Sequence, residues 1–382
     1  MAIDPVSSAA ISPSDRVRVM IVDDSAVVRG LVSRILEDDP DVQVVTSVGN
    51  GQMAISALER NPVDVILLDI EMPVMDGMTA LPKLLALDPH VRVIMQSTLT
   101  VKGADVSMRA LEIGAADYIA KPTTTRDLVG GLDFKTELLG KVKALGAARR
   151  RLAPRRQAAP AAAPHAAALL HPAASPAPRP AAIVRQAMPE PPDIIAIGSS
   201  TGGPQALFSV FGTMRAGTVR QPILITQHMP ATFTTILAEH ISRVSGWDAR
   251  EAQDGEIVSG GRVYIAPGDF HMVLDKKGPD TVLRLNKNPP ENFCRPAVDP
   301  MLRSVAAIYG KRTLACILTG MGSDGLKGGH NVVAAGGTVI AQDEASSVVW
   351  GMPGAVATAG ICSAILPLPE IAPWIMKLAA RR

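Results

Sequence analysis

The chain has few of the residues that mark several classes of protein. Aromatic residues make up 3% of its 382 residues, and its three cysteines have no spacing typical of a zinc site or a disulfide framework. The net charge is +2, so no excess of charge points to nucleic acid. No apolar run suits a bilayer span, and residues 1–15 lack a signal-peptide pattern. We therefore expect a cytoplasmic protein without membrane insertion, whose cysteines are small core residues.

The length of the chain predicts more than one domain, because single hydrophobic cores rarely grow so large. Residues 143–192 are rich in Ala, Pro and Arg and poor in residues that form a core, which is typical of a linker. We expect a first domain over 16–142, this linker, and a second domain over 193–382. The clusters Arg149-Arg150-Arg151 and Arg155-Arg156 are interpreted as solvated linker charges, with binding to an acidic partner as the alternative.

The first domain alternates β-branched runs with amphipathic stretches, which predicts a doubly wound, five-stranded parallel α/β sheet. Polar side chains stand where the expected strands end, and parallel strands bring such ends to one edge. They are Asp23, Asp24, Asp69, Ser97 with the adjacent Thr98, and Lys121. Three carboxylates beside one lysine suit Mg²⁺ and a carboxylate that accepts a phosphoryl group. Expected strands cover 17–22, 42–48, 63–68, 91–95 and 117–120; expected helices cover 27–36, 52–60, 79–87, 105–113 and 125–139.

These residues, with the segment Leu67-Leu68-Asp69-Ile70-Glu71-Met72-Pro73-Val74-Met75-Asp76-Gly77 and Lys121-Pro122, resemble the receiver domain of two-component response regulators. The resemblance implies that Asp69 is phosphorylated and that Asp23, Asp24 and Asp69 hold Mg²⁺. It also implies that Ser97 and Lys121 sense the acyl phosphate. Tyr118 matches the aromatic switch position of these domains.

The second domain opens on Ile194-Ile195-Ala196-Ile197-Gly198-Ser199-Ser200-Thr201-Gly202-Gly203-Pro204, which predicts a strand, a Gly-rich turn and a helix. Ser200 is then placed as a nucleophile at the end of a strand. A loop of this kind also suits an anion at a helix N-terminus, and both interpretations stay open on this stretch alone.

Further along, strands are expected to lead into His228 and Asp324, within an α/β domain that has a mostly parallel sheet. Ser200, His228 and Asp324 make a nucleophile, a base and a residue that orients the base. Gly198-x-Ser200-x-Gly202 fits the α/β-hydrolase elbow, but those enzymes have the order Ser, Asp, His. Asp269 with His271 or His330 would restore that order and is the alternative, while His240 is interpreted as a surface or packing histidine.

A second resemblance, to the chemotaxis protein-glutamate methylesterases, spans residue 193 nearly to the C-terminus. It rests on Ile197–Gly203, Thr226–Pro230, Tyr264–Met272, Arg295-Pro296 with Asp299, and Leu318–Gly325. It implies hydrolysis of glutamate γ-methyl esters on chemoreceptor helices, deamidation of receptor glutamines, and Ser200, His228 and Asp324 as the triad. Ser199 stands where the family commonly has Ala.

Ester hydrolysis by such a triad needs no cofactor, and the oxyanion is expected to meet backbone N–H groups near Thr201 and, by the resemblance, Met321. The expected partners are methylated chemoreceptor cytoplasmic helices and a chemotaxis-type histidine kinase as phosphodonor. A receiver on the same chain predicts that its phosphorylation changes access to Ser200. The alternative function is a receiver-linked protein that binds receptors or a nucleotide without turnover.

Overall fold

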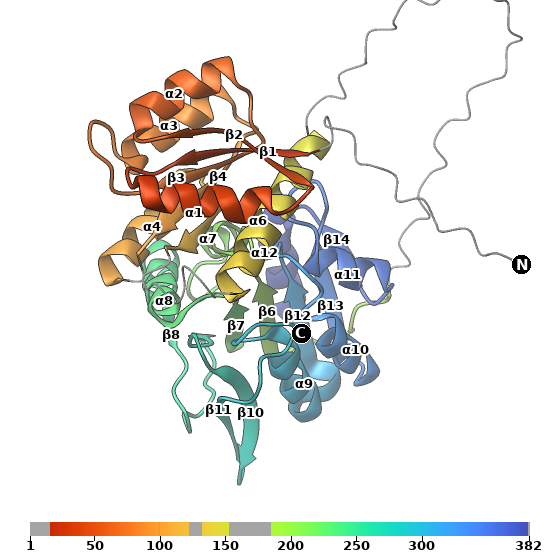
Figure 1. Cartoon of the computed structure of the whole chain (residues 1–382). Coiled ribbons are helices and arrows are strands. Elements are labelled where there is room, and N and C mark those ends of the chain that lie inside the picture. Colours follow the sequence, from red (N-terminus) through yellow and green to blue (C-terminus); the bar gives the residue numbers. More distant parts are fainter. Residues whose placement is uncertain (1–15, 99, 122–131, 153–184, 381–382) are drawn as a thin grey trace, which may run out of the picture.

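The computed structural model describes residues 16–98, 100–121, 132–152 and 185–380, and one large parallel sheet lies in each of the two predicted domains (Figure 1). The first sheet has five parallel strands in the order β2-β1-β3-β4-β5, as predicted. The strands are β1 (Val17–Val22), β2 (Val42–Val48), β3 (Val65–Asp69), β4 (Arg92–Ser97) and β5 (Asp117–Ala120).

Helices cover both faces of this first sheet. Side chains of α1 and α6 pack with one face, and those of α2, α3 and α4 pack with the other. The alternation of strands and helices is therefore confirmed, and Pro82 lies inside α3. The bounds are α1 (Ala26–Glu37), α2 (Gly51–Arg60), α3 (Gly77–Leu87), α4 (Val101–Ile113) and α6 (Leu132–Leu152).

The helix α6 corrects the expectation of a linker that begins at residue 143. It continues to Leu152, and three of its arginines form ion pairs instead of lying free in solvent. Arg149 binds Asp64 and Asp88 at 2.7 Å each, and Arg151 binds Glu344 of the second domain at 3.1 Å. Arg150 pairs with Asp64. Most of the expected linker, including Arg155 and Arg156, lies outside the described residues.

The second sheet is wholly parallel, with the order β14-β13-β12-β6-β7-β9-β8. The chain starts in the centre at β6, goes to one side through β7, and later returns to the other side at β12, so the order reverses beside β6. The strands are β6 (Ile194–Ser199), β7 (Ile223–Gln227), β8 (Asp248–Glu251), β9 (Arg262–Ile265), β12 (Thr313–Ile317), β13 (Thr338–Gln342) and β14 (Ala364–Leu366).

Two helical layers cover the second sheet. Side chains of α7, α8 and α12 pack on one face, and α9, α10 and α11 pack on the other together with an antiparallel hairpin of β10 and β11. The bounds are α7 (Gly203–Thr213), α8 (Ala231–Ser245), β10 (His271–Lys277), β11 (Asp280–Asn286), α9 (Val298–Tyr309), α10 (Leu326–Ala334), α11 (Met352–Thr358) and α12 (Leu368–Ala379).

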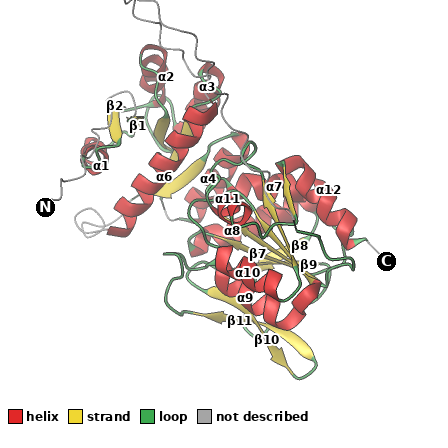
Figure 2. Ribbon diagram, turned by 90° about the vertical axis from the view of Figure 1, so that its right-hand side faces the viewer, coloured by secondary structure: helices red, strands yellow, loops and turns green. Residues whose placement is uncertain are grey.

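The two domains pack directly on each other (Figure 1; Figure 2). The buried apolar core beneath α2, α3 and α4 is continuous with that beneath α7 and α8, and α4 lies against α8. Tyr118 of the edge strand β5 stacks on Phe233 of α8, with ring centroids 4.2 Å apart and an angle of 6° between the ring planes. The contact therefore includes the predicted aromatic switch residue.

Among the described residues, no helix is both long and apolar enough to cross a membrane. Of the three cysteines, Cys316 and Cys362 are buried in the second domain, as expected of small core residues. Cys294 is not a core residue, because it is only half-buried.

Candidate functional site

Ser199 is the last residue of the central strand β6, and Ser200 directly follows it. The two side chains lie in different environments. Ser199 is fully buried, and its Oγ donates a hydrogen bond to Gln227 Oε1 at 2.7 Å. Ser200 is half-buried. Its N–H donates to Thr319 O at 3.0 Å, and its carbonyl accepts from Gln227 Nε2 at 2.9 Å. The backbone of Ser200 is thus held on both sides, while its hydroxyl makes no hydrogen bond among the described residues.

Two glycines after Ser200 are needed where they stand. Gly202 has a φ of 74°, in the left-handed region, and a Cβ there would lie 2.5 Å from the Val348 side chain. A Cβ on Gly203 would lie 2.0 Å from Gln227 Oε1. These contacts fix the turn from β6 into α7, so the Gly-rich pattern is required for packing whether or not the loop binds an anion.

His228 follows the neighbouring strand β7, and Asp324 reaches it from the loop after β12. His228 Nε2 lies 2.8 Å from Asp324 Oδ2. Asp324 is almost fully buried and accepts the N–H groups of Val298 and Asp299, at 2.6 and 3.0 Å, in the first turn of α9. Since α9 has no side-chain cap of its own at Ala297, Asp324 satisfies these two N–H groups and gains from the helix dipole.

The pKa values of this pair move apart. Burial alone raises the pKa of Asp324, but the bonds from His228, Val298 and Asp299 outweigh it and hold the pKa below its usual value. Burial lowers the pKa of His228, yet its bonds to Asp324 and Cys294 raise that pKa to about 10. This resting structure therefore favours a carboxylate beside an imidazolium.

The remaining imidazole nitrogen faces a thiol. His228 Nδ1 lies 3.3 Å from Cys294 Sγ, and no hydrogen bond joins Nδ1 to the hydroxyl of Ser200 among the described residues. Cys294 was expected in the core. Its thiol instead contacts the imidazole nitrogen that would accept the proton of Ser200. Geometry of this kind is common in resting enzymes, where such bonds tighten only with substrate.

Asn292 and Asp299 support the carboxylate side of the site. Asn292 Nδ2 donates to Asp324 Oδ1 at 2.8 Å and to Asp299 Oδ2 at 3.0 Å. Asp299 is fully buried, and its Oδ1 accepts from the N–H groups of Gly325 and Gly328. Asn292 was not among the expected site residues, and Cys294 was expected only as a small core residue. The motif containing Asp299 was noted, and an acid in the first turn of an expected helix was the available signal.

The two backbone N–H groups expected to face an oxyanion are available. Among the described residues, neither the N–H of Thr201 nor that of Met321 donates to another protein group, whereas the N–H of Ser200 is taken by Thr319. The Thr201 residue is buried and the Met321 side chain is 37% exposed. These two groups remain the expected oxyanion donors.

The alternative set built on Asp269 does not assemble. The Asp269 carboxylate binds Arg295 and Lys287 at 2.6 and 2.7 Å on an exposed surface. His271 is buried and bonds backbone groups, Pro289 O and the N–H of Ala297. His330 is exposed on α10. This geometry disfavours the order Ser, Asp, His.

His240 is a packing histidine at the contact between domains, not a surface residue. Its side chain is 1% exposed, and Nδ1 lies 3.0 Å from Glu112 Oε1 of α4. The ring also packs against Phe208, with centroids 5.6 Å apart.

The receiver's predicted residues meet at the carboxyl edge of the first sheet. The Asp23, Asp24 and Asp69 carboxylates have oxygens within 4.8 Å of one another. Lys121 Nζ lies 2.6 Å from Asp69 and 3.0 Å from Asp23. Burial raises the pKa of Asp69, against the lowering effect of Lys121. Apart from this lysine, the buried Oδ2 atoms of Asp23 and Asp69 have no partner in the described part of the chain, so the residues present fit Mg²⁺.

Ser97 lines the pocket at Asp69, whereas Tyr118 lies at the contact with the second domain. Ser97 is buried, and its Oγ donates to Gly103 O at 3.0 Å, while the adjacent Thr98 is exposed. Lys141 Nζ of α6 donates to Tyr118 O at 2.6 Å and lies 3.3 Å from Asp117 Oδ2. Burial raises the pKa of Asp117, while Lys141 and the hydroxyl of Thr201, which follows Ser200 in the chain, lower that pKa. The receiver thus contacts the residue next to Ser200.

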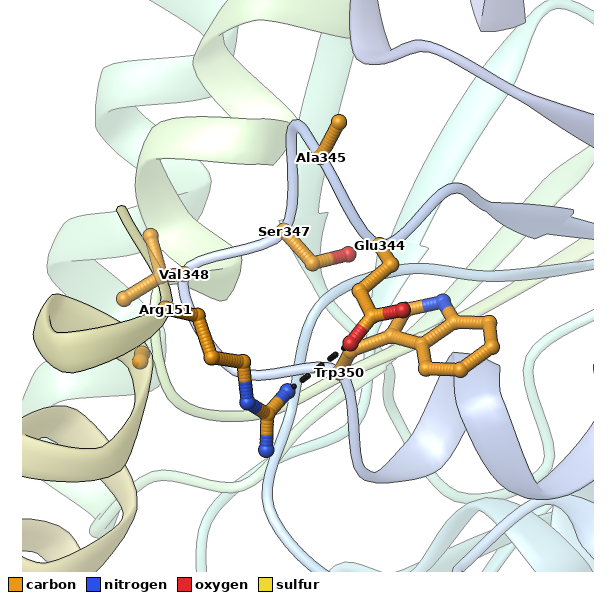
Figure 3. A pocket seen from close by; sticks show the side chains of 7 residues that line it. Arg151, Glu344, Ala345, Ser347, Val348 and Trp350 are labelled. Atoms are coloured by element: carbon orange, nitrogen blue, oxygen red, sulfur yellow. Dashed lines mark hydrogen bonds and ion pairs between the residues drawn. The ribbon is translucent and has the colours of Figure 1, made fainter. Parts of the chain in front are cut away.

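The helix α6 also lies over the Met321 side of the site. A Cβ on Gly140 would lie 3.0 Å from Met321 Cε. Farther along, α6 and the loop 343–351 line a pocket of about 270 Å³, closed at one side by the Arg151–Glu344 ion pair (Figure 3). In that loop, Val348 and Val349 pack with the receiver core, and Val349 exchanges hydrogen bonds with the Thr319 hydroxyl beside Ser200.

A hydroxyl, an imidazole and a carboxylate lie at the edge of one parallel sheet, and three carboxylates and a lysine lie at the edge of the other. These are features of a response regulator with a hydrolase effector domain. The receiver-domain family model matches residues 19–133, and that of CheB methylesterase matches 195–375. The chain belongs to the family of chemotaxis protein-glutamate methylesterases with a receiver domain.

Its relatives in that family are close. It is 74% identical to a protein-glutamate methylesterase/protein-glutamine glutaminase of Paramagnetospirillum magneticum, over all of both chains. It is 64% identical to one of Azospirillum brasilense, over 96% of this chain and 94% of the relative. A crystal structure of the Thermotoga maritima CheB methylesterase catalytic domain is 43% identical, with a TM-score of 0.48, and the match covers 49% of this chain and 98% of that one.

Proposed function

We propose that the chain is a phosphorylation-controlled serine hydrolase that demethylates glutamate γ-methyl esters on chemoreceptor helices. The observation that carries the proposal is the bond of 2.8 Å between His228 Nε2 and a buried Asp324, at the end of the strand next to the one that leads into Ser200. A loop that only bound an anion would need neither the imidazole nor the carboxylate. The names of the relatives support the same activity.

The reaction follows from the roles of these three groups. Ser200 Oγ attacks the ester carbonyl, and its proton passes to the neutral form of His228 at Nδ1, since Nε2 is taken by Asp324. The oxyanion is stabilised by the N–H groups of Thr201 and Met321. The imidazolium then returns the proton to the leaving methoxide, so methanol departs. Water repeats the attack on the acyl-enzyme and releases the glutamate carboxylate.

The same steps act on a glutamine side chain, where ammonia replaces methanol as the leaving group. We therefore include deamidation of receptor glutamines in the proposal, in line with the glutaminase activity named for the relatives. Within the domain, hydrolysis uses only side chains and backbone N–H groups. The partners are the cytoplasmic helices of methylated chemoreceptors.

In the receiver, Asp69 accepts a phosphoryl group from a chemotaxis-type histidine kinase. Mg²⁺ held by Asp23, Asp24 and Asp69 would neutralise charge on the transferred group. Lys121, at 2.6 Å from Asp69, binds the acyl phosphate, and Ser97 turns from Gly103 O to meet it.

The receiver inhibits the hydrolase by covering it. Tyr118 stacks on Phe233, Gly140 lies against Met321, and Asp117 contacts Thr201, so three receiver groups contact the second domain, one of them directly beside Ser200 in the chain. Phosphorylation draws Ser97 and Lys121 inward and moves Tyr118, which weakens this closed contact. A bias of about 2 kcal/mol would change the ratio of open to closed forms roughly thirtyfold.

Methanol release from methylated receptor fragments tests the activity directly. We expect the protein to release methanol, with a higher rate after a phosphodonor and Mg²⁺ are added. Tight binding of the fragments without methanol would favour instead a receiver-linked binding protein.

A further inference from the structure

A tight turn at Glu291–Cys294 contacts both the His228 imidazole and the Asp324 carboxylate. The N–H of Glu291 donates to Cys294 O at 3.2 Å, and the N–H of Cys294 donates to Glu291 O at 2.9 Å. Two residues, Asn292 and Phe293, form the tip, with φ values of 52° and 63°. This turn has left-handed backbone at both central positions, which favours Asn followed by Gly.

Phe293 breaks that preference at a cost. A bulky side chain with positive φ crowds its own backbone, and packing usually compensates for such strain. Here packing of the Phe293 side chain does not compensate, because the residue is 101% exposed, and the conformation is held by its neighbours in the turn. Residues held in such strained backbone conformations cluster at active sites and at segments that bind ligands.

The turn holds Phe293 in a fixed place relative to the site. On one side of it in the chain, Asn292 bonds to Asp324 and Asp299; on the other, Cys294 contacts His228. At the base of the turn, Glu291 binds Arg303 of α9 at 2.7 Å. Phe293 is therefore one residue away from contacts to both the imidazole and the carboxylate, and its ring points into solvent.

We propose that Phe293 determines specificity for a helical protein substrate by packing on the receptor helix that carries the methyl ester. This inference rests on the function proposed above. The site already demands a substrate that brings a side-chain ester to Ser200, and a helix doing so presents side chains of adjacent turns on the same face as that ester. A rigid, projecting aromatic ring suits such a surface, and aromatic anchors of this kind carry much of the binding energy of interfaces.

The test compares two substrates in the full-length protein. Methanol release is measured with a methylated receptor fragment, and hydrolysis of a small soluble aryl acetate reports on the triad alone. For Phe293→Ala we expect kcat/KM on the receptor fragment to fall roughly tenfold, mainly through KM, with the aryl acetate rate unchanged. Phe293→Tyr should keep the receptor rate. Ile257→Ala, which truncates another exposed apolar side chain of the domain, is the matched control and should change neither.

A second variant separates the ring from the strain. Phe293→Gly supplies the residue that the turn prefers, so its thermal midpoint should rise while its receptor rate falls as for Ala. Equal losses on both substrates would reduce Phe293 to a structural role, and an unchanged receptor rate in Phe293→Ala beside an active wild type would overturn the inference alone. Absence of methanol release from the wild type would instead overturn the proposed function, and this inference with it.

Discussion

The two sites are built at the carboxyl edges of two parallel sheets. They differ in how far their supporting residues lie from the strand ends along the chain. In the receiver, Asp69 ends β3, Ser97 ends β4, and Lys121 directly follows β5. In the second domain, Ser200 and His228 directly follow their strands, whereas Asp324 comes from a longer loop and is held by the first turn of α9. The first site is thus almost complete at its strand ends, while the second depends on a scaffold assembled from distant segments.

The largest expected effect tests which hydroxyl of the second site is the nucleophile. Ser200→Ala should lower kcat by about 10⁶-fold, because removing a triad nucleophile removes the covalent route altogether. Ser199→Ala removes only a buried bond to Gln227 and should keep the chemistry, with lower stability. The measurement is methanol release together with thermal unfolding of both variants. Near-normal turnover in Ser200→Ala, with loss in Ser199→Ala, would exchange the two roles.

The same difference between the two sites explains which of their residues could be predicted from the sequence. Strands β1, β2 and β5 have the predicted bounds, and the receiver residues Asp23, Asp69 and Lys121 meet as expected, because strand periodicity reports them directly. Asn292 and Cys294 were missed because only tertiary packing brings them to Asp324 and His228. The arginines of α6 were misinterpreted, since composition shows their charge but not the carboxylates that bind them.

A substitution at the contact between α6 and the second domain should raise basal activity by roughly tenfold. This corresponds to a shift of about 1.4 kcal/mol in the balance between closed and open forms. Gly140→Leu places a side chain where even a Cβ would lie 3.0 Å from Met321, so it should push α6 off the site. Gly30→Leu is the matched control: Gly30 is also helical, in α1, but a Cβ there would meet nothing within 4 Å. Methanol release without a phosphodonor compares them. The same low rate in both variants would mean that α6 does not limit access.

The smallest expected effect concerns pH. Activity needs neutral His228, whose pKa is raised to about 10 by Asp324 and Cys294 against the lowering effect of burial. The rate should therefore rise with pH toward that value. Cys294→Ala removes one of the raising contacts, so the rise should move to lower pH and activity near neutrality should increase.

The control for this pH shift is Cys362→Ala, which removes a buried thiol away from the site. It should leave the midpoint of the pH profile in place, and so should Cys362→Ser. A midpoint that stays the same in Cys294→Ala would show that the thiol does not hold the imidazolium.

Coupling between the two sites is the central claim, and basal methanol release by residues 193–382 beside the intact, unphosphorylated chain tests it most directly. The account predicts that the isolated domain is faster by roughly thirtyfold, corresponding to about 2 kcal/mol. A phosphodonor with Mg²⁺ should bring the intact chain toward the same rate, and Asp69→Asn should stay slow under those conditions. Equal basal rates for the isolated domain and the intact chain would contradict occlusion of Ser200 by the receiver.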